Sequence, residues 1–138
     1  MRITKPPLVT TACHCRGCQR MSSSAYSLTG IFPADGFQVS SGEPVIGGLH
    51  GAETAHFFCA YCMTWLFTRP QTAPQVVNVR PTLFDDTSWA APFIETFVET
   101  KLPWANTGAQ HSFPSFPAMD RFEGLMQAFA SQRAREAR

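Results

Sequence analysis

Charge is scarce in this sequence: only 15% of its 138 residues are acidic or basic, and the formal net charge at pH 7 is +1. A chain so close to neutrality offers no positive field to a phosphate backbone, which argues against a nucleic-acid partner. Hydrophobic residues make up 44% of the chain, enough to form a core and to exclude a disordered protein. We therefore expect residues 1–138 to form one folded domain.

Long apolar runs are also missing. No stretch approaches the roughly 20 consecutive apolar residues of a membrane span. Residues 1–7 contain neither the apolar segment nor the small-residue cleavage site of a secretory signal. These absences predict a cytoplasmic protein without a membrane partner, whose cysteines stay reduced.

Cysteine is present in an odd number, which does not suit a complete intramolecular disulfide framework. The five residues form two clusters: Cys13, Cys15 and Cys18, then Cys59 and Cys62. Each cluster contains C-x2-C, the spacing at which a tight turn directs two sulfurs at one ion, and zinc takes four nitrogen or sulfur ligands. Zinc is favoured over iron because no fourth cysteine lies close to the first cluster. Disulfides and unligated redox thiols are the alternatives to a metal site.

Alternation along an extended chain decides which side chains near the first cluster can face a metal. If residues 10–15 are extended, Cys13 and Cys15 point to one side, and the first cluster has three converging thiols. His14 then points to the opposite side, so we interpret it as a packed histidine. His56, shortly before the second cluster, is a candidate fourth ligand.

The remaining sequence has the pattern of short strands separated by turns. Strands are expected at 8–13, 25–32, 37–39, 54–58, 64–67, 76–79 and 93–100. Asp85 and Asp86 lie in a segment rich in turn formers. Neighbours on an extended chain face apart, so these aspartates are expected to cap a turn and not to form a carboxylate pair.

Only residues 119–138 have the pattern of a helix, which we expect to span about 120–134. Asp120 is the expected N-cap, because Glu123 follows three residues later as in a capping box. Apolar residues recur there at helical spacing and predict a packing face made by Phe122, Leu125, Met126 and Phe129.

Five linked motifs allow a family to be named. They are C-H-C-x-x-C at 13–18, Ser-Ala-Tyr at 24–26, F-C-x-x-C at 58–62, Leu-Phe-Asp-Asp at 83–86 and Lys-Leu-Pro-Trp at 101–104. Together they resemble the glutathione-dependent formaldehyde-activating enzyme family, which includes centromere protein V, over residues 7–104. The resemblance implies a mainly β fold, a β-tent of small antiparallel sheets around a cysteine zinc site, here followed by the C-terminal helix.

The resemblance also implies an activity. It assigns a catalytic zinc to Cys13, Cys15 and Cys18, and a share of a structural zinc to Cys59 and Cys62. The expected enzyme is a carbon–sulfur lyase acting on a thiol–aldehyde adduct such as S-hydroxymethylglutathione, so its partner is a small thiol such as glutathione. The alternative is a non-catalytic, zinc-stabilised β domain that binds a small ligand or a protein.

Arg16 and Arg20 flank the first cluster. They can offset the charge of three thiolates, or meet the carboxylates of glutathione. Solvated surface arginines are the equally simple alternative.

The chain departs from the family pattern before the first cluster. The family completes its structural site with an earlier C-x-C hairpin, and residues 1–7 resemble the end of the strand that follows it, so we expect the chain to begin inside the family domain. One zinc shared by Cys15, Cys18, Cys59 and Cys62 is then an alternative to two sites. Without the hairpin, the uncharged strand 8–12 is expected at an uncovered sheet edge, where it invites a homodimer.

A second departure is Met63, where the family usually has glycine. A knuckle often requires left-handed backbone directly after its second cysteine, and a residue other than glycine adopts it at a cost of about 1 kcal/mol or more. Met63 therefore predicts a relaxed or metal-free second knuckle.

Overall fold

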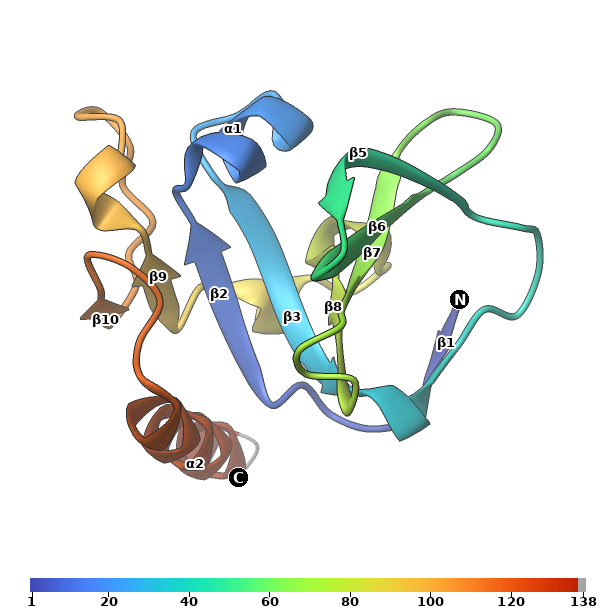
Figure 1. Ribbon diagram of the computed structural model, residues 1–138. Coiled ribbons are helices and arrows are strands. Elements are labelled where there is room, and N and C mark those ends of the chain that lie inside the picture. Colours follow the sequence, from blue (N-terminus) through green and yellow to red (C-terminus); the bar gives the residue numbers. More distant parts are fainter. Residues whose placement is uncertain (137–138) are drawn as a thin grey trace.

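The computed structural model describes residues 1–136, which form a mainly β fold with two sheets and a C-terminal helix (Figure 1). This confirms the predicted fold class. The smaller sheet pairs β1 (Arg2–Ile3) with β4 (Phe37–Gln38). The larger sheet has eight strands in the order β10 (His111–Ser112), β9 (Ile94–Thr96), β2 (Val9–Cys13), β3 (Ser27–Pro33), β8 (Val76–Val79), β7 (Trp65–Pro70), β6 (Thr54–Phe58) and β5 (Val45–Gly51).

The larger sheet is mixed, and so differs from the small antiparallel sheets that the resemblance implies. β9 pairs parallel with both β2 and β10, while the other neighbours are antiparallel. Parallel strands need a crossover connection. The chain between β8 and β9 provides it through the short 3-10 helices η2 (Pro81–Leu83) and η3 (Ser88–Ala90).

The expectation of an uncovered edge at residues 8–12 is wrong. β2 lies inside the sheet, with β3 hydrogen-bonded on one side and β9 on the other. The reason is the parallel return of β9, which occupies the side of β2 that local pairing leaves open. The argument for a homodimer through this strand therefore no longer holds.

The C-terminal helix α2 (Met119–Glu136) packs against the N-terminal end of β2 (Figure 1). Phe122, Leu125 and Phe129 are buried against a cluster that includes Val9, Ile31, Phe93 and Ile94, with Met126 at its border. This confirms the predicted packing face. Asp120 lies within the first turn, so its assignment as the N-cap is wrong: the helix begins one residue earlier than that residue.

The expectation of a single helix is wrong, because α1 (Arg16–Ser22) follows the first cysteine pair. Cys15 is its N-cap and its side chain accepts a hydrogen bond from the backbone N–H of Cys18 at 3.3 Å. The seven residues have no buried side chain among them. Hydrophobic periodicity therefore gives no sign of this helix, which depends on the cap.

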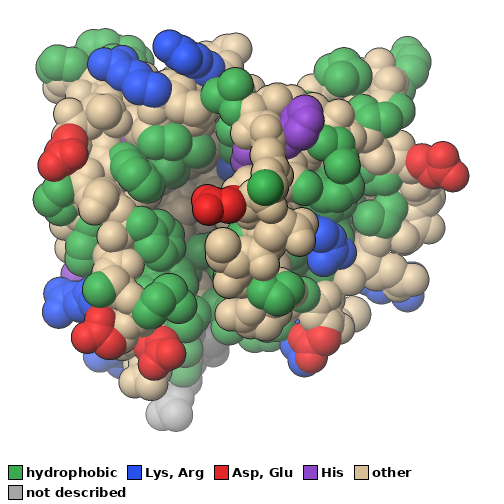
Figure 2. Space-filling model, in the orientation of Figure 1, with side chains coloured by type: hydrophobic (Ala, Val, Ile, Leu, Met, Phe, Trp, Pro, Cys, Tyr) green, Lys and Arg blue, Asp and Glu red, His purple; other side chains and the backbone are tan. Residues whose placement is uncertain are grey.

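In the space-filling view the molecule is notched between the part that contains β2, β3 and α1 and the part that contains β5 and β6 (Figure 2).

Neither helix in the described part of the chain has the length and apolar composition required to cross a membrane.

Candidate metal centre and its cavity

Three thiols converge where β2 meets α1. Cys13 is the last residue of the strand, Cys15 caps the helix, and Cys18 lies in its first turn. Their sulfur atoms all lie within 4.8 Å of one another. Zn–S bonds of about 2.3 Å in a tetrahedron place sulfurs about 3.8 Å apart, so this donor set fits a metal ion after small side-chain adjustments. The sequence-based expectation that the two ends of C-H-C share a side is consistent with this geometry.

Hydrogen bonding within the cluster favours one thiolate. The pKa of Cys15 is lowered to about 2 because the thiols of Cys13 and Cys18 and two backbone N–H groups donate to its sulfur. The pKa values of Cys13 and Cys18 are raised, first by their contact with the neighbouring thiols and then by burial. The cluster therefore has a negatively charged sulfur ready for a cation, and its other two thiols need a cation to ionise.

The second knuckle is a separate, closed turn. The backbone N–H of Met63 donates to the carbonyl of Cys59 at 2.9 Å, and that of Cys59 donates to the carbonyl of Thr64 at 2.9 Å. Met63 has φ = +57°, the left-handed conformation that glycine adopts most freely. Of the two predicted alternatives, the relaxed knuckle is wrong, since the turn is kept at the cost of strain. A metal-free knuckle stays a prediction.

The two knuckles do not combine. Among residues 1–136, the single set of three or more His, Cys, Asp or Glu side chains close enough for one ion is Cys13, Cys15 and Cys18. The arrangement with one ion shared by Cys15, Cys18, Cys59 and Cys62 is therefore not formed. All five cysteines are free of disulfides, and Cys62 is exposed, with its sulfur 3.1 Å from the hydroxyl of Thr64.

A buried hydrogen bond between His14 and Glu95 lies beside the first cluster. His14 is fully buried, and its Nε2 lies 2.9 Å from a carboxylate oxygen of Glu95 on the neighbouring strand. This confirms the interpretation of His14 as a packed residue. Glu95 also accepts hydrogen bonds from Lys101, Thr107 and Ser112.

The same network lowers the pKa of Glu95. Burial opposes ionisation, but the hydrogen bonds from its partners more than offset it and hold the pKa at about 2. Gln19 adds a second connection: its side-chain amide donates to the carbonyls of His14 and Thr100. The thiol-bearing turn is thus fixed to the segment that contains η4 (Val98–Thr100).

The cluster opens into a cavity of about 310 Å³. Cys13 and Cys18 form part of its wall, and β2, β3 and β6 contribute alternate residues, as expected for one face of a sheet. The residues from the strands include Thr11 on β2, Ser27, Thr29 and Ile31 on β3, Thr54 and His56 on β6, Trp65 and Thr68 on β7, and Asn78 on β8, followed by Arg80.

His56 lies on this wall but does not join the thiols as a ligand. It is buried, and its Nδ1 lies 2.8 Å from the hydroxyl of Thr68, which also accepts from the indole N–H of Trp65 at 3.2 Å. Burial and the nearby positive charge of Arg80 lower the pKa of His56. The ring is therefore neutral at pH 7.

Arg80 is the residue of the cavity that sequence reasoning missed. It is only 8% exposed, and its guanidinium lies 4.0 Å from the ring of Trp65. Burial lowers its pKa to about 10, against the opposing effect of Cys18 and Cys13, so it remains a cation at pH 7. The sequence signal was a charged residue directly after the valine-rich strand Val76–Val79. Glu95, also missed, had a similar signal, because it interrupts an otherwise uncharged strand.

The other candidates stay outside this site. Arg16 and Arg20 are exposed, and Arg16 bonds to Gln19 at 3.3 Å. Asp86 accepts from the backbone N–H of Ser88 at 2.9 Å, which confirms its role as a turn former.

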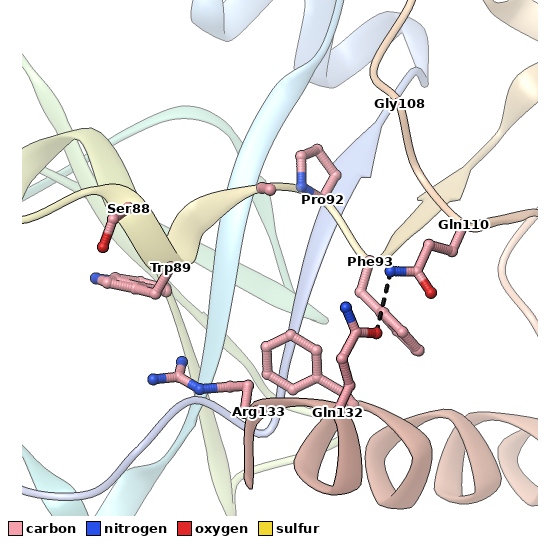
Figure 3. A pocket seen from close by; sticks show the side chains of 10 residues that line it. Ser88, Trp89, Pro92, Phe93, Gly108, Gln110, Gln132 and Arg133 are labelled. Atoms are coloured by element: carbon pink, nitrogen blue, oxygen red, sulfur yellow. Dashed lines mark hydrogen bonds between the residues drawn. The ribbon is translucent and has the colours of Figure 1, made fainter. Parts of the chain in front are cut away.

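A further cavity of about 390 Å³ lies between η3 and α2, away from the cysteines (Figure 3). Trp89 and Arg133 face one another on one side, and Gln110 donates to Gln132 at 3.0 Å on the other. It contains no side chain that can act as a soft metal ligand.

Comparison with known proteins agrees with the motifs. The sequence model of one family, described as glutathione-dependent formaldehyde-activating enzyme, matches residues 1–100. No curated protein sequence matches the chain. Among solved structures, a Rhodobacter sphaeroides protein from a structural genomics programme is similar, with 14% identity and a TM-score of 0.50 over 61% of this chain and 77% of that one. At this identity the likeness concerns the fold alone.

Proposed function

The chain belongs to the glutathione-dependent formaldehyde-activating enzyme family, and from this premise we propose that its first cysteine cluster is the zinc site of a carbon–sulfur lyase. The observation that carries the proposal is the position of the cluster. Its thiols lie within 4.8 Å of one another, and two of them form part of a cavity wall. A purely structural zinc site is closed by four protein ligands, whereas a catalytic site keeps one position for substrate. Three converging thiols beside a cavity fit the second type.

The proposed substrate is the adduct of a small thiol with formaldehyde, such as S-hydroxymethylglutathione. In the direction of breakdown, the carbon–sulfur bond cleaves and its electron pair stays on sulfur. The hydroxyl oxygen forms the carbonyl of formaldehyde, and its proton ends on the released thiol. Addition of the thiol to formaldehyde is the same step in reverse.

Zinc, when bound by Cys13, Cys15 and Cys18, would supply a Lewis acid that stabilises thiolate at neutral pH. The protein's own contribution is position and environment. The Glu95–His14 hydrogen bond holds the end of β2, and the sheet face lines the cavity beside the thiols. Five free thiols also suit a reducing compartment, so we place the protein in the cytoplasm.

The proposal is tested by the rate at which glutathione, formaldehyde and their adduct interconvert, measured by NMR exchange with and without zinc-loaded protein. We expect faster exchange with the protein and none of this gain with Cys15→Ser. The matched control is Cys62→Ser, which removes an exposed thiol outside the cluster. Exchange at the uncatalysed rate with fully loaded protein would favour the alternative, a non-catalytic zinc-stabilised domain.

A further inference from the structure

Arg80 is a buried cation that makes no ion pair with an Asp or Glu side chain in the described part of the chain. Its Nε and Nη1 have no hydrogen-bond partner, and its remaining nitrogen, Nη2, reaches the carbonyl of Asn78 only at 3.5 Å. The ion pairs of residues 1–136 involve other side chains. Contact with the Trp65 ring compensates part of the lost hydration. Burying a charge without a paired carboxylate opposes folding. A buried arginine at a cavity wall is therefore a candidate for binding an anionic ligand.

Arg80 also stands where two cavities meet. The cavity of the thiol cluster, about 310 Å³, and a second one of about 490 Å³ share three wall residues: Ser27, Trp65 and Arg80. The second cavity contains no further Lys, Arg, Asp or Glu among its wall residues. Arg80 is therefore the Lys or Arg side chain that both cavity walls share. A ligand whose sulfur lies at the thiol cluster can reach its guanidinium from either cavity. Fixed N–H groups of a guanidinium match a carboxylate in geometry as well as in charge.

We propose that Arg80 is a substrate-binding residue that selects thiols carrying a carboxylate. The inference rests on the proposed function, because it requires the thiol to bind at the cluster. It assigns the carboxylate to the shared wall of the two cavities and leaves the sulfur to the metal end. The exposed Arg16 and Arg20 are not needed for this recognition.

The test uses the protein loaded with cobalt(II), whose visible spectrum changes when a thiol sulfur binds. Two small thiols serve as probes: mercaptoacetate, which carries a carboxylate, and 2-mercaptoethanol, which has a neutral hydroxyl at the same place. For each variant, the ratio of their dissociation constants cancels the intrinsic difference between the thiols. We expect Arg80→Met to shift this ratio about 10- to 100-fold against mercaptoacetate, the range of a hydrogen-bonded charge contact.

Arg69→Met is the matched control. Arg69 also stacks on aromatic rings, 5.4 Å from the Phe37 centroid and 5.8 Å from that of Phe67, but it lines neither cavity. We expect it to keep the wild-type ratio. Arg80→Gln is a second neutral variant that retains a donor for the Asn78 carbonyl, and it should lose the preference as Arg80→Met does.

The outcomes separate the two proposals. If neither thiol changes the cobalt spectrum, the proposed thiol site itself is wrong. If both thiols bind and the ratio is the same in wild type, Arg80→Met and Arg80→Gln, the thiol site stands and the carboxylate inference is overturned. A large fall in melting temperature for both neutral variants would also overturn it, because the charge would then be paired within the fold.

Discussion

His14 and Glu95, which are 81 residues apart in the sequence, meet at 2.9 Å, and both side chains are buried. His14 directly follows β2, and Glu95 lies on β9, the parallel neighbour of β2. The pair connects the strand that ends in Cys13 to the strand that follows the long crossover. His14 lies between Cys13 and Cys15, so this hydrogen bond holds the backbone from which two of the three thiols project.

Replacing Glu95 by glutamine should destabilise the fold by about 2–4 kcal/mol at pH 7, because a buried histidine and a lysine lose their charged partner. Urea unfolding measures the change. Asp35→Asn is the control, since the Lys5–Asp35 pair is exposed and should contribute less than about 1 kcal/mol. Equal effects of the two substitutions would contradict the structural role of Glu95.

The low pKa of Glu95 predicts sensitivity to acid. The carboxyl has a pKa of about 2 when folded and an ordinary value of 4.5, so its contribution is fully present above pH 4.5. It should be lost as the pH falls from 4.5 toward 2. Melting temperatures across this window should fall more steeply for wild type than for Glu95→Gln, and parallel curves would refute the assignment.

Single cysteine substitutions should divide into two groups. Cys13→Ser, Cys15→Ser and Cys18→Ser should each lower the zinc content, because each removes one of three converging ligands. Cys59→Ser and Cys62→Ser should leave zinc at the first cluster, since these residues lie outside it. Elemental analysis of the purified variants gives the result, and uniform loss across all five would show that the knuckles share an ion.

Met63→Gly should stabilise the protein by roughly 0.5–1 kcal/mol, because glycine adopts the left-handed backbone at φ = +57° without steric cost. Thermal unfolding is the measurement. Met63→Ala is the control, since it shortens the same exposed side chain but keeps the Cβ atom that causes the strain. A gain in the alanine variant equal to that in the glycine variant would point to the side chain instead of the backbone.

The sequence by itself was sufficient for features that depend on local spacing. The C-H-C-x-x-C spacing predicted three converging thiols, and alternation predicted that His14 would pack on the other side. The helical recurrence of Phe122, Leu125 and Phe129 predicted their burial. In each case a few consecutive residues carry the information, because strand and helix geometry fix the direction of neighbouring side chains.

Tertiary structure alone decided the rest. The parallel return of β9 to β2 removed the expected open edge. Likewise, no local pattern places Arg80 in the wall of the cavity that Cys13 and Cys18 also line. Nor does one predict the hydrogen bond between Glu95 and His14. These contacts join residues more than 60 positions apart, so they depend on which strands pair and on how the sheet curves. Such long-range pairings are chosen by the burial of the whole chain, and a short motif does not encode them.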